Sequence, residues 1–160
     1  MTNLMRLRQG DPRLLETDRA SSLLNGREPA RVAYVAADGT PRIYPTYFVW
    51  AAGQLVMGTY AGGLKIAALR ARPAVAISID TLGDPPTILQ IRGLAELTDV
   101  AGVVPEYIQA QAQFRGTEAA RAVLAEIDRP GLRMVRIAVT PAWVGLIDFQ
   151  ERLPQAMTAR

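Results

Sequence analysis

Turn residues that separate short segments rich in β-branched and aromatic residues are the feature that most constrains the fold of this chain. The stretch RVAYVAADGTPRIYPTYFVWAAGQLVMGTY (31–60) contains Asp38-Gly39 and Ala52-Gly53. An Asp-Gly pair between such segments is a strong hairpin signal. The stretch therefore predicts three antiparallel strands in a meander, at residues 31–36, 41–50 and 54–59.

The remainder of the chain alternates helical and strand-like patterns. Apolar residues at helical spacing predict a helix over 12–24, and a short helix over 64–72 ends before Pro73. Further strands are predicted at 74–80, 87–97, 132–140 and 143–148, and further helices at 103–114 and 117–127, the latter with Thr117 as its N-cap. The strand at 87–97 places Ile88, Gln90, Arg92 and Leu94 on one face. Strands at this spacing indicate a closed antiparallel barrel with helical additions, and 160 residues suit a single domain.

The sequence contains no cysteine and no histidine. Without cysteine, disulfides, thiol redox chemistry and thiolate metal sites are excluded. Without histidine, the commonest general base and the commonest neutral metal ligand are missing, so a Ser-His-Asp triad is impossible. We therefore predict no metal site and no catalytic side chain, and we expect a bound cofactor to carry any enzymatic chemistry.

The charge pattern bears on possible partners. The formal net charge is +3, and the basic residues are scattered, with no run of four or more and no basic patch interleaved with aromatic residues. This pattern argues against nucleic acid as a partner. No apolar stretch reaches the length of a membrane span, and MTNLMRLRQGDPRLL lacks the apolar core of a signal peptide. We expect a cytoplasmic protein without a membrane partner.

Lys65 is the only lysine of the chain and follows two glycines in TYAGGLKIAALRARP (59–73). Glycines at a strand-to-helix junction let the backbone approach a ligand closely. The first turn of a helix carries free N–H groups and a partial positive charge that favour a phosphate, and Lys65 adds a point charge. The alternative is a glycine turn followed by a helix with a solvated lysine, and these residues alone leave both open.

The order of the segments has a wider resemblance. Over 30–99 the segments come in a fixed order: a strand, an Asp-Gly hairpin, PRIYPTYFVW, a glycine turn, LVMGT, Gly-Gly-Leu-Lys, a helix with LRARP, a strand, a loop and ILQIRGLAELTD. This series resembles the pyridoxamine 5'-phosphate oxidase-like family, the flavin-binding split β-barrels, and RMVRIAVTPAWVGLIDF is similar to the closing strands of that family. The resemblance implies a fold that is mainly β with helices, a six- to seven-stranded antiparallel split barrel with flanking helices. The single domain, 1–160, then comprises an N-terminal helix (12–25), a barrel core (31–99), a helical insertion (103–127) and closing strands (132–149).

The resemblance also implies a phosphorylated ring cofactor at the interface of a homodimer. Lys65 would bind the phosphate, with Thr59 and Gly63 on the same side. Arg42 and the backbone of 44–47 would run along the ring, and the second subunit would complete the site. The residues assigned to cofactor binding on this basis are Arg42, Tyr44, Pro45, Thr46, Tyr47, Thr59, Gly63, Lys65, Gln90 and Trp143. The alternative for the aromatic residues is a place in the core or an interface, and for Arg42 a solvated strand position.

One departure from the family pattern leaves the cofactor open. Members that bind flavin mononucleotide (FMN) usually carry Ser-Arg immediately before the lysine, whereas this chain has Gly63-Leu64. The change removes a hydroxyl and a bidentate phosphate ligand. FMN is therefore one expectation and the deazaflavin coenzyme F-420 the other. We predict an oxidoreductase that transfers hydride to or from a small organic substrate, and we do not expect true pyridoxamine phosphate oxidase activity. The alternative is a non-catalytic flavin-binding or stress-related dimeric protein with the same fold.

Overall fold

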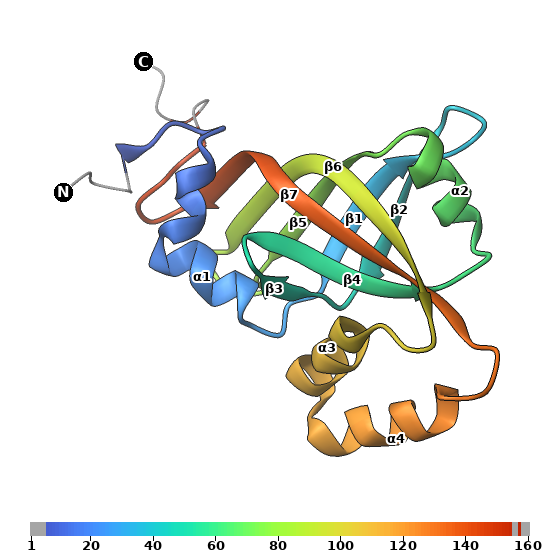
Figure 1. Cartoon of the computed structure of the whole chain (residues 1–160). Helices are drawn as coiled ribbons and strands as arrows, with labels where there is room; N and C mark the ends of the chain where they lie inside the picture. Colours follow the sequence, from blue (N-terminus) through green and yellow to red (C-terminus); the bar gives the residue numbers. More distant parts are fainter. Residues whose placement is uncertain (1–5, 155–156, 158–160) are drawn as a thin grey trace.

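The computed structural model describes residues 6–154 and residue 157. Within them, seven strands form one antiparallel sheet in the spatial order β2-β1-β5-β6-β7-β4-β3 (Figure 1). The strands are β1 (Ala30–Val35), β2 (Pro41–Thr46), β3 (Val49–Ala51), β4 (Gln54–Tyr60), β5 (Ala74–Asp80), β6 (Thr87–Ala101) and β7 (Arg133–Asp148). The helices are α1 (Asp18–Leu24), α2 (Leu64–Ala71), α3 (Pro105–Arg115) and α4 (Thr117–Ile127), with a 3-10 helix at Pro12–Glu16. The prediction of a mainly β fold with helices is confirmed.

The two edge strands of the sheet are neighbours along the chain. Only Tyr47 and Phe48 separate β2 from β3, although these strands lie at opposite edges. Three Cα–Cα steps span at most about 11 Å, so the sheet must curve until its edges approach each other. In the part of the chain that the structure describes, no hydrogen-bonded ladder joins β2 to β3. The sheet is therefore strongly curved but open, and the closed barrel is not confirmed.

The prediction of one strand over 41–50 is wrong, and with it the three-stranded meander. Tyr47 stacks on Phe114 of α3 with ring centroids 4.5 Å apart, and Phe48 meets the same ring edge-on at 5.7 Å. Successive residues of a strand point to opposite faces, so two neighbours that pack on one ring interrupt the strand. The chain leaves β2 at this point and begins β3 at the other edge.

One face of the curved sheet, the inner face, buries the core. In β6, Leu89 and Ile91 are buried while Gln90 and Arg92 are exposed, so the predicted alternation is confirmed. Full burial of such an apolar side chain stabilises the fold by about 1.5–3 kcal/mol. The largest fully buried side chains are Phe48, Leu14, Leu24, Leu55, Met57, Leu69, Ile79, Leu89, Ile91, Met134, Ile137 and Leu146.

The two strands predicted after residue 131 are one continuous strand, β7. Its partner β6 pairs Arg92 with Trp143 but Gly93 with Pro141, so Ala142 is an extra residue in a β-bulge. A bulge accommodates proline, which cannot donate a hydrogen bond to a ladder. Pro141 therefore bends the strand without ending it, and β6 and β7 pair along their whole lengths.

Two helix starts also differ from the prediction. The helix predicted over 12–24 breaks at Thr17, whose backbone is extended and whose hydroxyl accepts a hydrogen bond from the N–H of Ala20 (3.3 Å). Thr17 thus caps α1. The N-cap of α4 is Gly116 rather than Thr117, and it has a φ of 96°. That backbone conformation favours glycine over threonine.

The edge strand β2 contains two prolines, Pro41 and Pro45. Because proline has no N–H, it is tolerated in a sheet where the missing donor would face away from the neighbouring strand. Pro41 pairs with Val35 and Pro45 with Arg31 of β1. Both prolines therefore leave the pairing of β1 with β2 intact.

Gln9 and Gly10 cover the part of β7 that β4 does not reach. The N–H of Gly10 donates to the carbonyl of Val144 (2.7 Å). The side chain of Gln9 donates to the carbonyl of Leu146 (2.6 Å) and accepts from its N–H (2.8 Å). The segment thereby satisfies backbone groups on the free edge of a buried strand.

We expect Gln9→Ala to lower the free energy of unfolding by about 2 kcal/mol, because the N–H of Leu146 loses its partner. Urea unfolding measures the change. The matched control is Gln54→Ala, since the amide of Gln54 donates to the exposed hydroxyl of Thr140 (3.0 Å), and we expect a change below about 0.5 kcal/mol. Equal losses in the two variants would contradict the role assigned to Gln9.

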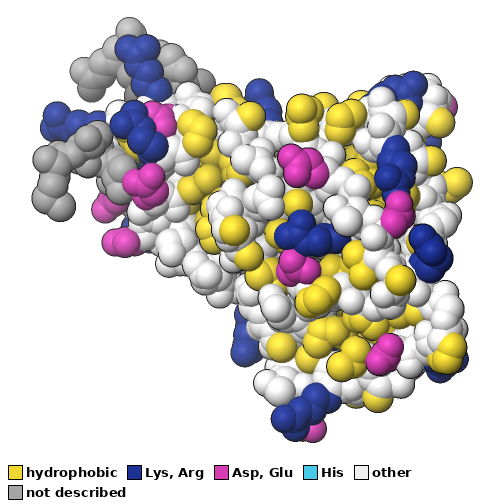
Figure 2. Space-filling view, in the orientation of Figure 1, with side chains coloured by type: hydrophobic (Ala, Val, Ile, Leu, Met, Phe, Trp, Pro, Cys, Tyr) yellow, Lys and Arg dark blue, Asp and Glu magenta, His cyan; other side chains and the backbone are white. Residues whose placement is uncertain are grey.

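The helices lie at different places around the sheet. Figure 1 shows α2 and α1 at opposite ends of the sheet, and α3 beside β3 and β4 with α4 beyond it. Figure 2 shows acidic and basic side chains interspersed over the face in view. Among the described residues, no helix has the length and apolar character needed to cross a membrane.

Candidate functional site

The loop between β4 and α2 leaves the amino end of α2 open. Gly62 has a φ of 87°, and no described heavy atom lies within 4 Å of the position that a Cβ would take. Gly63 is the N-cap and makes no side-chain cap, and the first turn contains no acidic residue. The free N–H groups and the positive end of the helix dipole therefore face open space. This end of the helix fits an anion.

Lys65 lies in this first turn and is half-buried. Its Nζ is 4.3 Å from the centroid of the Tyr44 ring on β2. Within the described residues, Lys65 makes no ion pair and no hydrogen bond. Burial lowers the pKa of the Lys65 ammonium, because desolvation disfavours the charged form. A half-buried cation without a carboxylate partner is the chemical complement of a phosphate.

The ring of Tyr44 packs against the ammonium of Lys65. Its ring meets the ring of Tyr34 edge-on at 5.9 Å, and its buried hydroxyl has no hydrogen-bond partner in the described structure. Burial, with a smaller contribution from Tyr34, raises the pKa of Tyr44 to about 12. The phenol is therefore neutral at physiological pH. Tyr44 therefore packs against the core and also contacts the lysine.

Arg42 lies on β2 but is held by the β1–β2 hairpin. Its guanidinium binds the carboxylate of Asp38 at 2.9 Å and the hydroxyl of Thr40. Hydrogen bonds from the side chain and backbone of Thr40, more than the charge of Arg42, lower the pKa of Asp38 to about 2. Arg42 lines a groove of about 380 Å³ between this hairpin and α2, and Leu64 lines the same groove.

Thr59 and Thr46 share the inner face with Tyr44. Thr59 lies two residues after the core residue Met57 in β4, which leads into α2. Thr46 lies two residues after Tyr44, one step further from the hairpin, and its hydroxyl donates to the carbonyl of Tyr47 (3.0 Å). Five predicted residues thus lie on this side of the sheet or at the start of α2, and Lys65 contacts Tyr44. We call these the inner group: Arg42, Tyr44, Thr59, Gly63 and Lys65.

Besides Thr46, which is on the inner face but outside the inner group, four predicted residues lie away from that group. Tyr47 packs on Phe114 of α3, as the alternative assignment to packing anticipated. Pro45, Gln90 and Trp143 belong to the opposite side of the sheet, where the residues of β1, β2, β5 and β6 that alternate with the core point outward. We call this side the outer face. One chain therefore does not bring Gln90 or Trp143 to Lys65.

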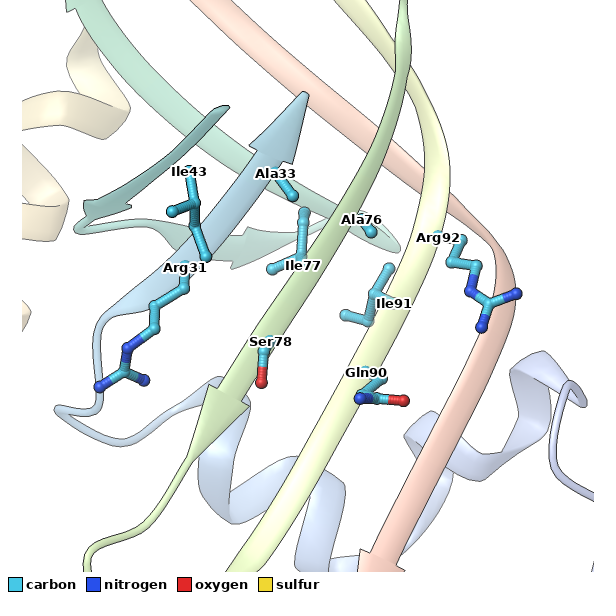
Figure 3. Close-up of a pocket in the computed structure, with 9 residues that line it drawn as sticks. All are labelled: Arg31, Ala33, Ile43, Ala76, Ile77, Ser78, Gln90, Ile91 and Arg92. Carbon is cyan, nitrogen blue, oxygen red and sulfur yellow. The ribbon is translucent and has the colours of Figure 1, made fainter. Parts of the chain in front are cut away.

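Polar and apolar residues form ordered rows on the outer face (Figure 3). Arg31, Ser78 and Gln90 are successive cross-strand partners on β1, β5 and β6. The next row consists of Ala33, Ala76, Arg92 and Trp143. The guanidinium of Arg92 lies 4.0 Å over the ring of Trp143.

Sequence reasoning placed Arg92 on the face of Gln90 without assigning it to a site, and it missed Arg31 and Ser78 as neighbours of Gln90. The alternation in β6 carried the signal for Arg92, since it shares a face with Gln90 two residues before it. Arg31 and Ser78 reach this place only through the register of three strands that are distant in sequence. Local patterns do not contain that register.

Comparison with known proteins places this geometry in a family. A family model described as pyridoxamine 5'-phosphate oxidase matches residues 17–146, which include all ten predicted site residues and every strand of the sheet except the last two residues of β7. The chain belongs to the pyridoxamine 5'-phosphate oxidase family. The resemblance inferred from the order of the strands is therefore confirmed. No curated protein sequence matches the chain.

Several solved structures have a similar fold. An F420 reductase is 26% identical, with a TM-score of 0.61 over 78% of this chain and 94% of that chain. General stress protein 26 from Bacillus anthracis is 20% identical, with a TM-score of 0.60 over 85% of this chain and 95% of that one. An FAD-binding protein from Mesorhizobium loti is 18% identical, with a TM-score of 0.50 over 79% and 87%. At these identities the last two show likeness of fold alone.

Proposed function

We propose that this member of the pyridoxamine 5'-phosphate oxidase family is an oxidoreductase. It uses FMN or the deazaflavin coenzyme F-420 to transfer hydride to or from a small organic substrate. The observation that carries the proposal is Lys65, half-buried without a carboxylate partner among the described residues, at the open amino end of α2. When bound, the ring cofactor supplies the redox chemistry.

The residues of the inner group have distinct roles in this proposal. Lys65 and the free N–H groups of α2 bind the phosphate. Tyr44 positions Lys65 by packing its ring against the ammonium. Arg42, already held by Asp38, borders the groove that leads away from the helix end. The protein binds and orients the cofactor, and we assign no acid or base to a side chain.

The division of the predicted residues between two faces supports a homodimer. Gln90 and Trp143 reach a cofactor held by Lys65 only if they come from a second copy of the chain. The outer face also contains an apolar recess of about 490 Å³ whose lining includes Ala33, Val35 and Leu94. Ile43 and Leu94 are 67% and 61% exposed. Contiguous exposed apolar residues are typical of an interaction surface.

We expect Ile43→Glu to weaken self-association roughly tenfold or more, because the new carboxylate would be desolvated without a partner at the interface. Sedimentation equilibrium measures the association constant. Leu82→Glu is the matched control, because Leu82 is 92% exposed in the loop between β5 and β6. An Ile43→Glu protein that associates as strongly as the control would exclude the outer face as the contact.

The choice between the two cofactors rests on the start of α2. Leu64 occupies the position before the lysine and is 92% exposed. Because its side chain is apolar, it offers the phosphate no charge. A single cation holds a phosphate less firmly than an arginine and a lysine together. The F420 reductase, at 26% identity, gives the deazaflavin additional support.

The residues before Lys65 also support the second candidate, a non-catalytic flavin-binding or stress-related dimeric protein. Gly63 and Leu64 contribute no phosphate ligand from their side chains, and general stress protein 26 shares the fold. A protein of this kind would keep the sheet and the dimer and would bind the cofactor without turnover.

The absorption spectrum of the purified protein, before and after heat release of bound molecules, tests the proposal. Titration of the protein, once it is free of bound molecules, with FMN and with F-420 then gives its affinity for each cofactor. Saturable binding of either cofactor, and its oxidation or reduction by a substrate, supports the oxidoreductase. Binding without turnover of any substrate supports the second candidate. Binding of neither cofactor rejects both.

A further inference from the structure

The outer face contains a small recess that the inner group does not reach. It has a volume of about 180 Å³ and lies across β1, β5 and β6 (Figure 3). Arg31, Ser78, Gln90 and Arg92 supply its polar lining, and the side chains of Ala33, Ile43 and Ala76 supply the apolar part. Ile77 and Ile91 also border the recess, but their side chains belong to the buried core. The recess is therefore suited to a small ligand that is polar at one end and apolar at the other.

The polar and apolar parts of the recess are segregated by strand register. Arg31, Ser78 and Gln90 form one row across the three strands. The next row on this face, two residues away along each strand, consists of Ala33, Ala76 and Arg92. The methyl groups of Ala33 and Ala76 lie beside Arg92 and form the bottom of the recess. Such short side chains leave the space above them free for an apolar body, while the first row offers hydrogen bonds.

The two arginines of the recess differ in charge compensation. Arg31 binds the carboxylate of Asp80 at 2.6 Å. In the described part of the chain, Arg92 has neither an ion pair nor a hydrogen bond, and its contact is the ring of Trp143. The uncompensated positive charge of the recess is therefore that of Arg92.

Trp143 holds the guanidinium of Arg92 in place. The indole itself is confined, because a Cβ on Gly145 would lie 2.6 Å from one of its ring carbons and a Cβ on Gly10 would lie 2.8 Å from its Nε1. Both glycines allow the ring to lie close against the backbone. Stacking on this fixed ring reduces the conformational entropy that Arg92 loses on binding a ligand.

We propose that Arg92 binds the carboxylate of a small organic acid whose apolar part lies over Ala33, Ala76 and Ile43. A single planar guanidinium matches a carboxylate through two parallel hydrogen bonds. The role of this acid as the substrate rests on the proposed function, in which the outer face of one subunit meets the inner group of the other. Arg92 is then a residue that determines substrate specificity.

The test compares 2-naphthoate with 2-naphthylmethanol, two probes that differ in the carboxylate. Equilibrium dialysis gives their dissociation constants for the wild-type protein and for Arg92→Gln, Arg92→Lys and Arg121→Gln. We expect the wild type to prefer 2-naphthoate about tenfold, since a hydrogen-bonded ion pair contributes more than a neutral hydrogen bond. Arg92→Gln should abolish the preference, and Arg92→Lys should retain part of it. Arg121→Gln removes an equal charge from the exposed surface of α4 and should leave the preference unchanged.

Titration of the same variants with FMN and F-420 separates this proposal from the proposed function. We expect Arg92→Gln to bind the cofactor as the wild type does. The proposal is overturned if the wild type shows no preference, if Arg92→Gln keeps it, or if Arg92→Gln weakens cofactor binding to the same degree. If the wild type binds neither cofactor but its preference for 2-naphthoate depends on Arg92, the oxidoreductase fails and the carboxylate site stands.

Discussion

Lys65→Met is expected to weaken the binding of FMN or F-420 by about 10- to 100-fold, because a charge-assisted hydrogen bond to the phosphate is lost. The stability of the free protein should not fall. The ammonium is half-buried, has no carboxylate partner in the described structure, and has a pKa that desolvation lowers. Methionine keeps the apolar contact with Tyr44 without that desolvation cost. Cofactor titration and thermal unfolding of the free protein measure the two effects.

Arg70→Met provides the matched control for this prediction. Arg70 lies on the same helix, in its last turn, and its guanidinium binds Asp99 at 2.8 Å. The control removes an equal charge from α2 without touching its amino end. We expect its cofactor affinity to change less than threefold, roughly the effect of an exposed ion pair. If Lys65→Met bound either cofactor as tightly as Arg70→Met does, the assignment of the phosphate to Lys65 would be wrong.

Gly93→Ala is expected to lower the free energy of unfolding by about 3 kcal/mol, the upper range for overpacking a tight interior. A Cβ on Gly93 would lie 2.3 Å from the carbonyl oxygen of Thr140 and 2.9 Å from Cγ1 of Val139. The first contact is with backbone at the bulge of β7, which cannot move without disturbing its pairing with β6. Urea unfolding with a fixed m-value measures the loss.

Gly83→Ala is the comparison for Gly93→Ala. Gly83 lies in the loop between β5 and β6, and a Cβ there would have only ordinary contacts, at 3.7 Å to the Thr81 hydroxyl and 3.8 Å to the Pro85 carbonyl. We expect a change within about 0.5 kcal/mol. Comparable losses in both variants would contradict the role assigned to the close contact at the bulge.

Local sequence patterns predicted most elements of this fold but not the path between two of them. The Asp38-Gly39 hairpin, the alternation of β6 and the start of α2 all follow from the residues themselves. The break at Tyr47 and Phe48 does not, because it depends on Phe114, which is 66 residues further along the chain. The continuity of β7 through Pro141 likewise depends on its pairing with Gly93.

The candidate site was predictable to the extent that it is local. Lys65, Gly63 and Thr59 are close in sequence, and their grouping needs only a strand, a turn and a helix. The contact between Lys65 and Tyr44 depends on how α2 packs near β2, which the sequence patterns did not predict. The separation of Gln90 and Trp143 from this group became visible only with the register of the whole sheet.

The prolines of β2 limit the addition of another strand to this edge of the sheet. Positions 41, 43 and 45 share one direction for their backbone N–H groups, and two of the three have no hydrogen to donate. An incoming strand would therefore find few donors along this edge of the sheet. Open sheets with such an exposed edge are otherwise prone to fibrous aggregation by strand addition. Pro41 and Pro45 thus act as gatekeepers against polymerisation while leaving the broad faces of the sheet free for specific contacts.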